Sequence, residues 1–191
     1  MKKTSLALLL ALIFGMAAVC AAAEIEDYSS TINVFKDSPA VAKFFENSYG
    51  YAVFPTIGKA GFVVGGSYGK GQVYVDEKVV GKASVVEGSI GFQIGGKAFS
   101  EIIFFQDKRA FDEFTSGNFE FGATAQAVAI TAGAEAKAGT TGLSAGASAG
   151  PKTGVQAETN YNKGMAVFVH SKGGLMAEAS VSGQKFNYEP L

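Results

Sequence analysis

One cysteine and one histidine occur in the 191-residue chain, and tryptophan is absent. The cysteine, Cys20, lies in an N-terminal apolar segment, so the rest of the chain has no thiol for a disulfide or a thiolate metal site. The histidine, His170, therefore has no second histidine or cysteine with which to share a metal ion or complete a catalytic triad. From these residues we expect no metal and no other cofactor.

Charge is scarce as well. Charged residues make up 17% of the chain, 16 basic and 17 acidic, for a net charge of −1. This mildly acidic balance argues against nucleic acid as the partner. Hydrophobic residues make up 48%, with 16 phenylalanines, which indicates a folded globular protein and not a disordered one.

The N-terminal segment has the pattern of an export signal. Two lysines precede an apolar run over residues 6–19, and three alanines follow at 21–23. This predicts a secretory signal peptide over residues 1–23 and a single domain over residues 24–191. A transmembrane helix is one alternative, although the run is short for spanning a bilayer. A lipoprotein acylated at Cys20 is another. We expect an exported, periplasmic protein, anchored to a membrane if Cys20 is acylated.

Residues 24–48 form the predicted helical lead, in two pieces. Apolar residues recur at spacings of three and four from Ile25 to Phe35, which places them on one face of a helix. Ser38 and Pro39 then supply an N-cap and a preset first turn for a second helix. These apolar faces either cover a sheet or touch a membrane. The candidates for membrane contact are Phe35, Phe44 and Phe45.

Residues 49–191 form the predicted β-rich core, because the hydrophobic pattern changes there to period two and to short runs bounded by Gly and Pro. Asp107 predicts the N-cap of one short helix over residues 108–114. The fold class expected is α+β and mostly antiparallel, a twisted sheet or barrel-like core of many short strands with N-terminal amphipathic helices. The expected strands are 49–55, 60–68, 72–75, 79–86, 89–95, 102–105, 119–130, 153–161, 164–170 and 175–181, with a hairpin turn at 173–174.

Three short motifs occur in the order used by serine β-lactamases: Ser67-x-x-Lys70, Ser116-x-Asn118 and Lys152-Thr153-Gly154. That chemistry needs the serine at the start of a helix, with the lysine one turn later facing its hydroxyl. Four glycines surround Ser67, which makes a helix there unfavourable. The same glycines fail as a phosphate-binding loop, since valine and glycine occupy positions where that motif needs glycine and a hydroxyl residue. We therefore expect no enzyme and no catalytic residues.

Several stretches, in order, closely resemble the SYLF domain family of lipid-binding and actin-binding-like domains, in its secreted bacterial type. They are Ser48–Gly71, Gly91-Phe-Gln-Ile-Gly-Gly, Ile102–Phe105, Gly122-Ala-Thr-Ala-Gln-Ala-Val-Ala, Tyr161-Asn-Lys-Gly-Met-Ala-Val-Phe and Lys172-Gly-Gly-Leu-Met-Ala-Glu-Ala-Ser-Val-Ser-Gly. The resemblance covers roughly residues 38–183. It implies a compact antiparallel β domain with helices packed around it, and a phospholipid or membrane surface as partner. Actin binding is not expected of a secreted bacterial member.

Charge indicates where a lipid headgroup would bind. Residues 24–48 carry a net charge of −3, so an anionic surface repels the helical lead, whereas residues 59–109 carry +2. Lysines in turns are commonly just solubilising residues. With that alternative open, the headgroup-binding candidates are Lys59, Lys70, Lys78, Lys82 and Lys97.

The function expected is therefore that of a non-catalytic, phospholipid-binding, envelope-associated periplasmic protein. The alternative is a structural or self-assembling envelope protein without specific lipid binding, which the Ala- and Gly-rich tract after Phe121 favours. A third interpretation, a strand-built outer-membrane protein, is disfavoured by strands that are apolar on both faces, such as Ile102–Phe105.

Overall fold

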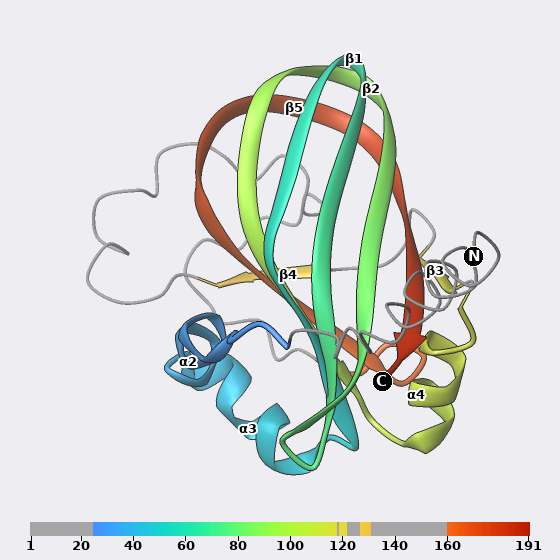
Figure 1. The fold of residues 1–191 in the computed structure, drawn as a ribbon. Helices are drawn as coiled ribbons and strands as arrows, with labels where there is room; N and C mark the ends of the chain where they lie inside the picture. The colour runs from blue at the N-terminus through green and yellow to red at the C-terminus, as the bar shows by residue number, and fades with distance from the viewer. Residues whose placement is uncertain (1–24, 118, 122–126, 131–159) are drawn as a thin grey trace, which may run out of the picture.

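The computed structural model describes residues 25–117, 119–121, 127–130 and 160–191. Two short helices lead into two very long strands; a third helix and two short strands follow, and a third long strand ends the chain (Figure 1). In order, the elements are α2 (Ser29–Lys36), α3 (Pro39–Asn47), β1 (Gly50–Val75), β2 (Lys78–Phe105), α4 (Lys108–Phe114), β3 (Phe119–Phe121), β4 (Ala127–Ile130) and β5 (Met165–Pro190).

The sheet has the order β1-β2-β5-β3, with β4 also paired to β5. All these pairings are antiparallel except that of β4, which runs parallel to β5. The mostly antiparallel α+β class predicted from the sequence is confirmed. The prediction of many short strands is wrong, because β1, β2 and β5 are 26, 28 and 26 residues long and each joins several of the expected strands.

Each long strand bends at its middle, so that the three-stranded sheet arches over and returns (Figure 1). Glycines allow this bend: Gly95 of β2 and Gly174 of β5 have positive φ angles of 116° and 105°, which L side chains rarely adopt. The predicted hairpin turn at 173–174 is therefore a bend inside a continuous strand. A Cβ added to Gly61 would lie 2.6 Å from the Cα of Gly65, so the two arms of β1 come close together just below the bend.

We call the part of the sheet next to the helices the basal half, and residues 58–70, 86–98 and 171–185 around the bend the apical half. The basal half has apolar residues on both faces. One cluster lies beneath α2 and α3, where the ring centroid of Phe44 is 5.0 Å from that of Phe168 and 5.5 Å from that of Phe104. A second cluster fills the space between the arms and extends to Phe114 of α4. These two clusters are the core of the described fold.

Two local predictions are confirmed in detail. Helix α4 spans the predicted residues, and the Asp107 carboxylate accepts a hydrogen bond of 2.9 Å from the backbone N–H of Ala110. Helix α3 begins at Pro39 as predicted, with Ser38 at the N-cap position, although the Ser38 side chain makes no capping hydrogen bond. A capping side chain marks the start of α4 and a proline at the first position marks the start of α3, so a single sequence suffices to place both.

Candidate functional site

The apical half reverses the usual distribution of polar and apolar side chains. Most of its buried side chains are polar, among them Lys59, Ser67 and Glu87, each 6% exposed, with Met176 as an apolar exception. On its outer face large hydrophobic side chains are exposed, including Phe62 at 73% and Phe92 at 66%. Apart from the irregularity at Val63, where Phe62, Val63 and Val64 are all exposed, exposed and less exposed positions largely alternate along β1 and β2, and here the apolar residues point to solvent.

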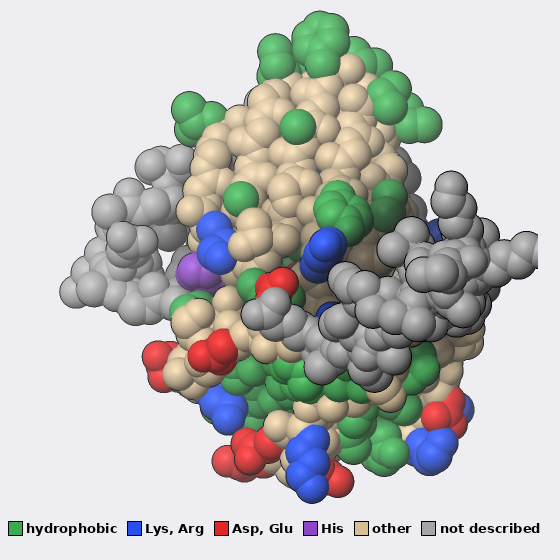
Figure 2. All heavy atoms as spheres, in the orientation of Figure 1, with side chains coloured by type: hydrophobic (Ala, Val, Ile, Leu, Met, Phe, Trp, Pro, Cys, Tyr) green, Lys and Arg blue, Asp and Glu red, His purple; other side chains and the backbone are tan. Residues whose placement is uncertain are grey.

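The exposed hydrophobic residues gather over the bend from all three long strands. Figure 2 shows them at the top of the molecule, above the belt of charged side chains. Large exposed hydrophobic side chains gathered at one end of a molecule indicate a site of interaction with another apolar body. We call it the apical apolar surface; it consists of Phe62, Val63, Val64, Ile90, Phe92, Ile94 and Leu175.

Below this surface the outer face of β1 and β2 becomes polar in steps. Val64 pairs with Ile90, Tyr68 with Val86, and Lys70 with Ser84. Tyr68 is 53% exposed and Lys70 is also exposed. Same-face residues two apart along a strand are separated by roughly 6.7 Å. The outer face thus passes from aliphatic to aromatic to basic with distance from the bend.

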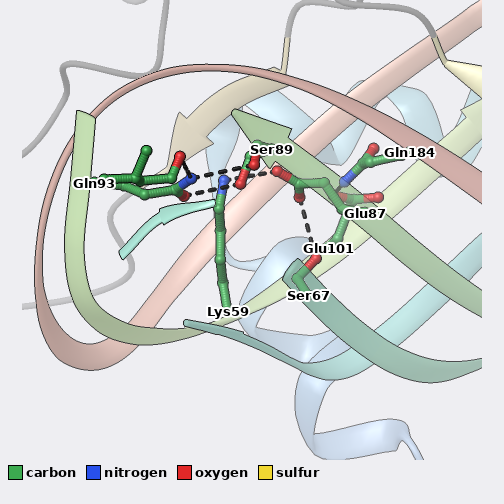
Figure 3. A network of polar contacts seen from close by, with 8 residues as sticks. Lys59, Ser67, Glu87, Ser89, Gln93, Glu101 and Gln184 are labelled. Carbon is green, nitrogen blue, oxygen red and sulfur yellow. Dashed lines mark hydrogen bonds and ion pairs between the residues drawn. The ribbon is translucent and has the colours of Figure 1, made fainter. Parts of the chain in front are cut away.

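A cluster of polar side chains lies between the arms beneath the bend (Figure 3). The Lys59 ammonium from β1 lies 2.6 Å from a carboxylate oxygen of Glu87 on β2, and Ser67 Oγ donates a hydrogen bond of 3.1 Å to the other oxygen. Lys59 and Ser67 belong to opposite arms of β1, so Glu87 joins the arms. We call the set the inner polar cluster: Lys59, Ser67, Glu87, Ser89, Gln93, Glu101 and Gln184.

The upper part of this cluster holds the bend in place. Gln93 Nε2 donates hydrogen bonds of 3.1 Å to the carbonyl of Val63 and 3.2 Å to the carbonyl of Ser89. Ser89 Oγ donates to Gln93 Oε1 at 2.8 Å. Val63 has a positive φ of 67°, which is strained for a β-branched residue. The Gln93 side chain therefore fixes the backbone at the point where β1 turns over.

Glu101 stands at the lower end of the cluster and is 1% exposed. Gln184 Nε2 donates a 3.1 Å hydrogen bond to its Oε2, whereas its Oε1 is buried and has no hydrogen-bond partner. Burial raises the pKa of Glu101 to about 7; the Gln184 bond opposes this shift, and the charge of Glu87 adds to it. The cluster thus combines a structural ion pair with a second carboxyl group, that of Glu101, whose raised pKa makes it titrate around neutral pH.

The structure does not bring the five predicted headgroup lysines together. Lys59 is buried against Glu87. Lys97 is its cross-strand partner and is half-buried, with its ammonium 6.0 Å from the ring centroid of Phe99. Lys70 and half-buried Lys82 lie on the arms of β1 and β2 that lead down from the bend, and exposed Lys78 lies at the basal turn. Headgroup binding by these lysines stays a prediction.

The three phenylalanines predicted to touch a membrane lie in or against the core. Phe35 is 0% and Phe44 is 4% exposed, and half-buried Phe45 packs edge-on against Phe104 with ring centroids 4.8 Å apart. The helices cover the sheet, as the alternative interpretation held, and Phe35 and Phe44 could reach a bilayer only by leaving the core. Sequence reasoning missed Phe62 and Phe92. The period-two alternation over residues 89–95 places Phe92 on one face with Ile90 and Ile94, but it does not show that this face is exposed.

The serine–lysine motif has strand geometry. Ser67 points inward to Glu87, and Lys70 lies exposed three residues further along β1, so the helical arrangement that the hydrolase chemistry needs is absent at this position. In the described ranges, no group of three or more His, Cys, Asp or Glu side chains could hold a metal ion. The helices described here are likewise too short or too polar to cross a membrane.

Some predictions fall on residues outside those described. They are the signal peptide over residues 1–23 with Cys20, the Ala- and Gly-rich tract after residue 130, the Lys152-Thr153-Gly154 motif and most of the strand expected over residues 153–161.

Two comparisons with known proteins give a match. The model of the Ysc84 family, described as "Las17-binding protein actin regulator", matches residues 86–189, which run from the apical part of β2 almost to the end of β5. Beta cell expansion factor A of Aeromonas veronii is 29% identical over 161 residues, 83% of this chain and 52% of that protein, and carries the same domain. The chain thus spans about half the length of that relative. No solved structure gives a significant match.

Proposed function

Because this chain belongs to the Ysc84 (SYLF) family, we propose that it binds phospholipid bilayers of the cell envelope by inserting its apical apolar surface. Members of the family commonly bind lipid. One observation carries the proposal: the apical half has its polar side chains inside and its large hydrophobic side chains outside. The signal-peptide pattern over residues 1–23 supports a periplasmic location. No catalysis is part of the proposal.

The graded outer face suits a bilayer better than a second protein surface. Tyrosine is enriched where hydrocarbon meets headgroups, and lysine side chains reach from there into the headgroup layer. Tyr68 and then Lys70 occupy those positions below Val64 of the apical apolar surface. Burying one phenylalanine side chain contributes about 1.5–3 kcal/mol, and each lysine near an anionic surface adds about 1 kcal/mol. A few such residues suffice for reversible binding.

Vesicle flotation tests the proposal with a matched pair of variants. The double variant Phe62→Ser/Phe92→Ser removes two exposed rings from the apical apolar surface, and Leu191→Ser removes a 55% exposed side chain at the basal end. We expect the double variant to bind mixed phosphatidylcholine and phosphatidylglycerol vesicles at least about 100-fold more weakly, and Leu191→Ser to bind like the parent. Equal binding by all three proteins would contradict insertion of this surface.

Self-assembly is the competing function, because an exposed apolar surface could also pair with a second copy. Light scattering without lipid separates the two functions. A monomer that floats with vesicles supports lipid binding. If the parent instead forms a stable oligomer, the double variant is a monomer and neither protein floats with vesicles, then self-assembly replaces lipid binding as the function.

A further inference from the structure

A pocket of about 320 Å³ lies on the outer face of β1, where the segment before α2 meets that strand. This volume is at the small end of the range for ligand sites, roughly 300–1,000 Å³. The pocket has an acid, a base and two phenol rings, since Glu26, Tyr28, Tyr68 and Lys70 are among its lining residues. Thr56 and Pro55, from the other arm of β1, complete the wall.

The folded core holds the acidic wall in place. Gln72 Nε2 donates a hydrogen bond of 3.0 Å to the carbonyl of Glu26, and the hydroxyl of Tyr74 donates to Gln72 Oε1 at 2.7 Å. Tyr28, two residues after Glu26, is 8% exposed and belongs to the core cluster beneath α2. The pocket is thus a built feature of the fold.

One ammonium group lines the pocket, and a second lies beside its wall at Thr56. Lys70 lines it, and Lys172 of β5 donates hydrogen bonds of 3.0 Å to the carbonyl of Pro55 and 3.1 Å to Thr56 Oγ1. Neither lysine forms an ion pair within the described part of the chain. The Thr56 hydroxyl and the two lysines are donors suited to a phosphate group.

The acid and the bases together select a ligand that carries both signs of charge. A simple phosphate would satisfy the lysines but would face the Glu26 carboxylate. A phosphate joined to an ammonium by a short linker would satisfy both, with Tyr68 offering a ring face to the cation. A primary ammonium also donates hydrogen bonds to a carboxylate, which a quaternary ammonium cannot do.

The distance of the pocket from the apical apolar surface agrees with a ligand that belongs to a bilayer lipid. Lys70 follows Val64 of the apical apolar surface by six residues, which is roughly 20 Å along a strand. One leaflet of hydrocarbon is about 15 Å thick. If the apical apolar surface inserts, as the proposed function requires, the pocket comes to lie in the headgroup layer.

We propose that this pocket binds the headgroup of phosphatidylethanolamine, with its phosphate at Lys70, Lys172 and Thr56 and its ammonium at Glu26. This inference rests on the proposed function, because the pocket reaches the lipid headgroups only if the apical apolar surface inserts into a bilayer. It adds a specific lipid to a surface that would otherwise bind any fluid bilayer.

Flotation with vesicles of phosphatidylcholine alone, or with one third replaced by phosphatidylethanolamine, tests this assignment. We expect the parent protein to bind the mixed vesicles about tenfold more tightly. Glu26→Gln and Lys70→Met should each bring that ratio of affinities close to one. The matched control is Lys43→Met, which removes an exposed lysine of α3 and should keep the preference. A parent without the preference, or pocket variants that retain it, would overturn the proposal.

A second arm separates this proposal from the general lipid function. Soluble O-phosphoethanolamine is titrated into the parent protein and followed by NMR, with inorganic phosphate in parallel. Selective, saturable shifts at the pocket that are lost in Glu26→Gln support the site even if no vesicle binds. Equal response to phosphate, or no response to either compound, counts against it. Loss of all flotation in Phe62→Ser/Phe92→Ser leaves this arm unaffected.

Discussion

The basal and apical halves of the sheet are built from the same three strands, yet they distribute polarity in opposite ways. In the basal half, Phe54, Ile103 and Phe104 are fully buried, with apolar partners on both faces. In the apical half, Glu87 and Lys59 are buried and Phe92 is exposed. The helices make the difference, because they cover the basal half and leave the outer face of the apical half in contact with solvent. One half therefore holds the fold together, and the other is available for an apolar partner.

The close approach of the two arms of β1 explains the glycines near the bend. Added Cβ atoms at Gly61 and Gly65 would come within 3.0 Å of Gln93 atoms or of backbone. The Gln93 side chain and the backbone occupy this space, so these two positions of β1 have no room for a side chain. Hydrogen bonds and one ion pair, rather than hydrophobic burial, join the arms there.

The largest difference between the halves should appear in stability. Phe104→Ala removes a fully buried ring that packs against Phe44 and Phe168, and should lower the free energy of unfolding by about 3–5 kcal/mol. Phe92→Ala, at a 66% exposed position, should change it by less than about 0.5 kcal/mol. Urea unfolding followed by circular dichroism measures both. Equal losses would show that the apical side chain is part of a packed core.

The ion pair of the inner polar cluster gives the next effect. Lys59→Met leaves the Glu87 carboxylate buried without its cation and should cost about 3 kcal/mol or more in unfolding free energy. The double variant Lys59→Met/Glu87→Leu should recover most of that loss, since it removes both charges together. A single variant as stable as the parent would mean that Glu87 has another compensating charge.

Glu101 gives a smaller effect that depends on pH. Its pKa is about 7 in the folded protein against 4.5 for an ordinary glutamate, so the folded state holds the proton more tightly. Its contribution to stability is therefore highest below pH 4.5, falls as pH rises through 7, and is lower by about 3 kcal/mol above it. Glu101→Gln, which can still accept the Gln184 hydrogen bond, should lose this pH dependence and exceed the parent in stability at pH 8. Parallel unfolding curves of the two proteins at pH 5 and pH 8 check this, and identical pH dependence would contradict it.

The fold class and the local helix signals could be predicted from the sequence. Asp107 and the Ser38–Pro39 pair placed helix starts correctly because capping depends on neighbours in the chain. The continuity of the strands could not be predicted from the sequence. Glycines such as Gly95 and Gly174 give the same sequence pattern whether they end a strand or bend it. Pairing with a neighbouring strand decides between these outcomes, and pairing is a tertiary property.

The candidate site was harder to predict for a related reason. Alternation over residues 89–95 separates Phe92 from Gln93 but does not say which of the two faces is buried. That is decided when the sheet folds over and brings Lys59 against Glu87, 28 residues away. The lysine proposed from charge alone was therefore buried, and the aromatic residues that the fold exposes were not singled out.

The central claim, that the apical half enters the bilayer while the basal half stays outside, can be measured with one reporter. The chain has no tryptophan, so Phe92→Trp and Leu191→Trp each introduce a single indole, one at each end of the molecule. With vesicles of brominated phosphatidylcholine, Trp fluorescence of the Phe92→Trp protein should shift to the blue and be quenched, and that of Leu191→Trp should do neither. Flotation of both proteins without quenching in Phe92→Trp would contradict the account.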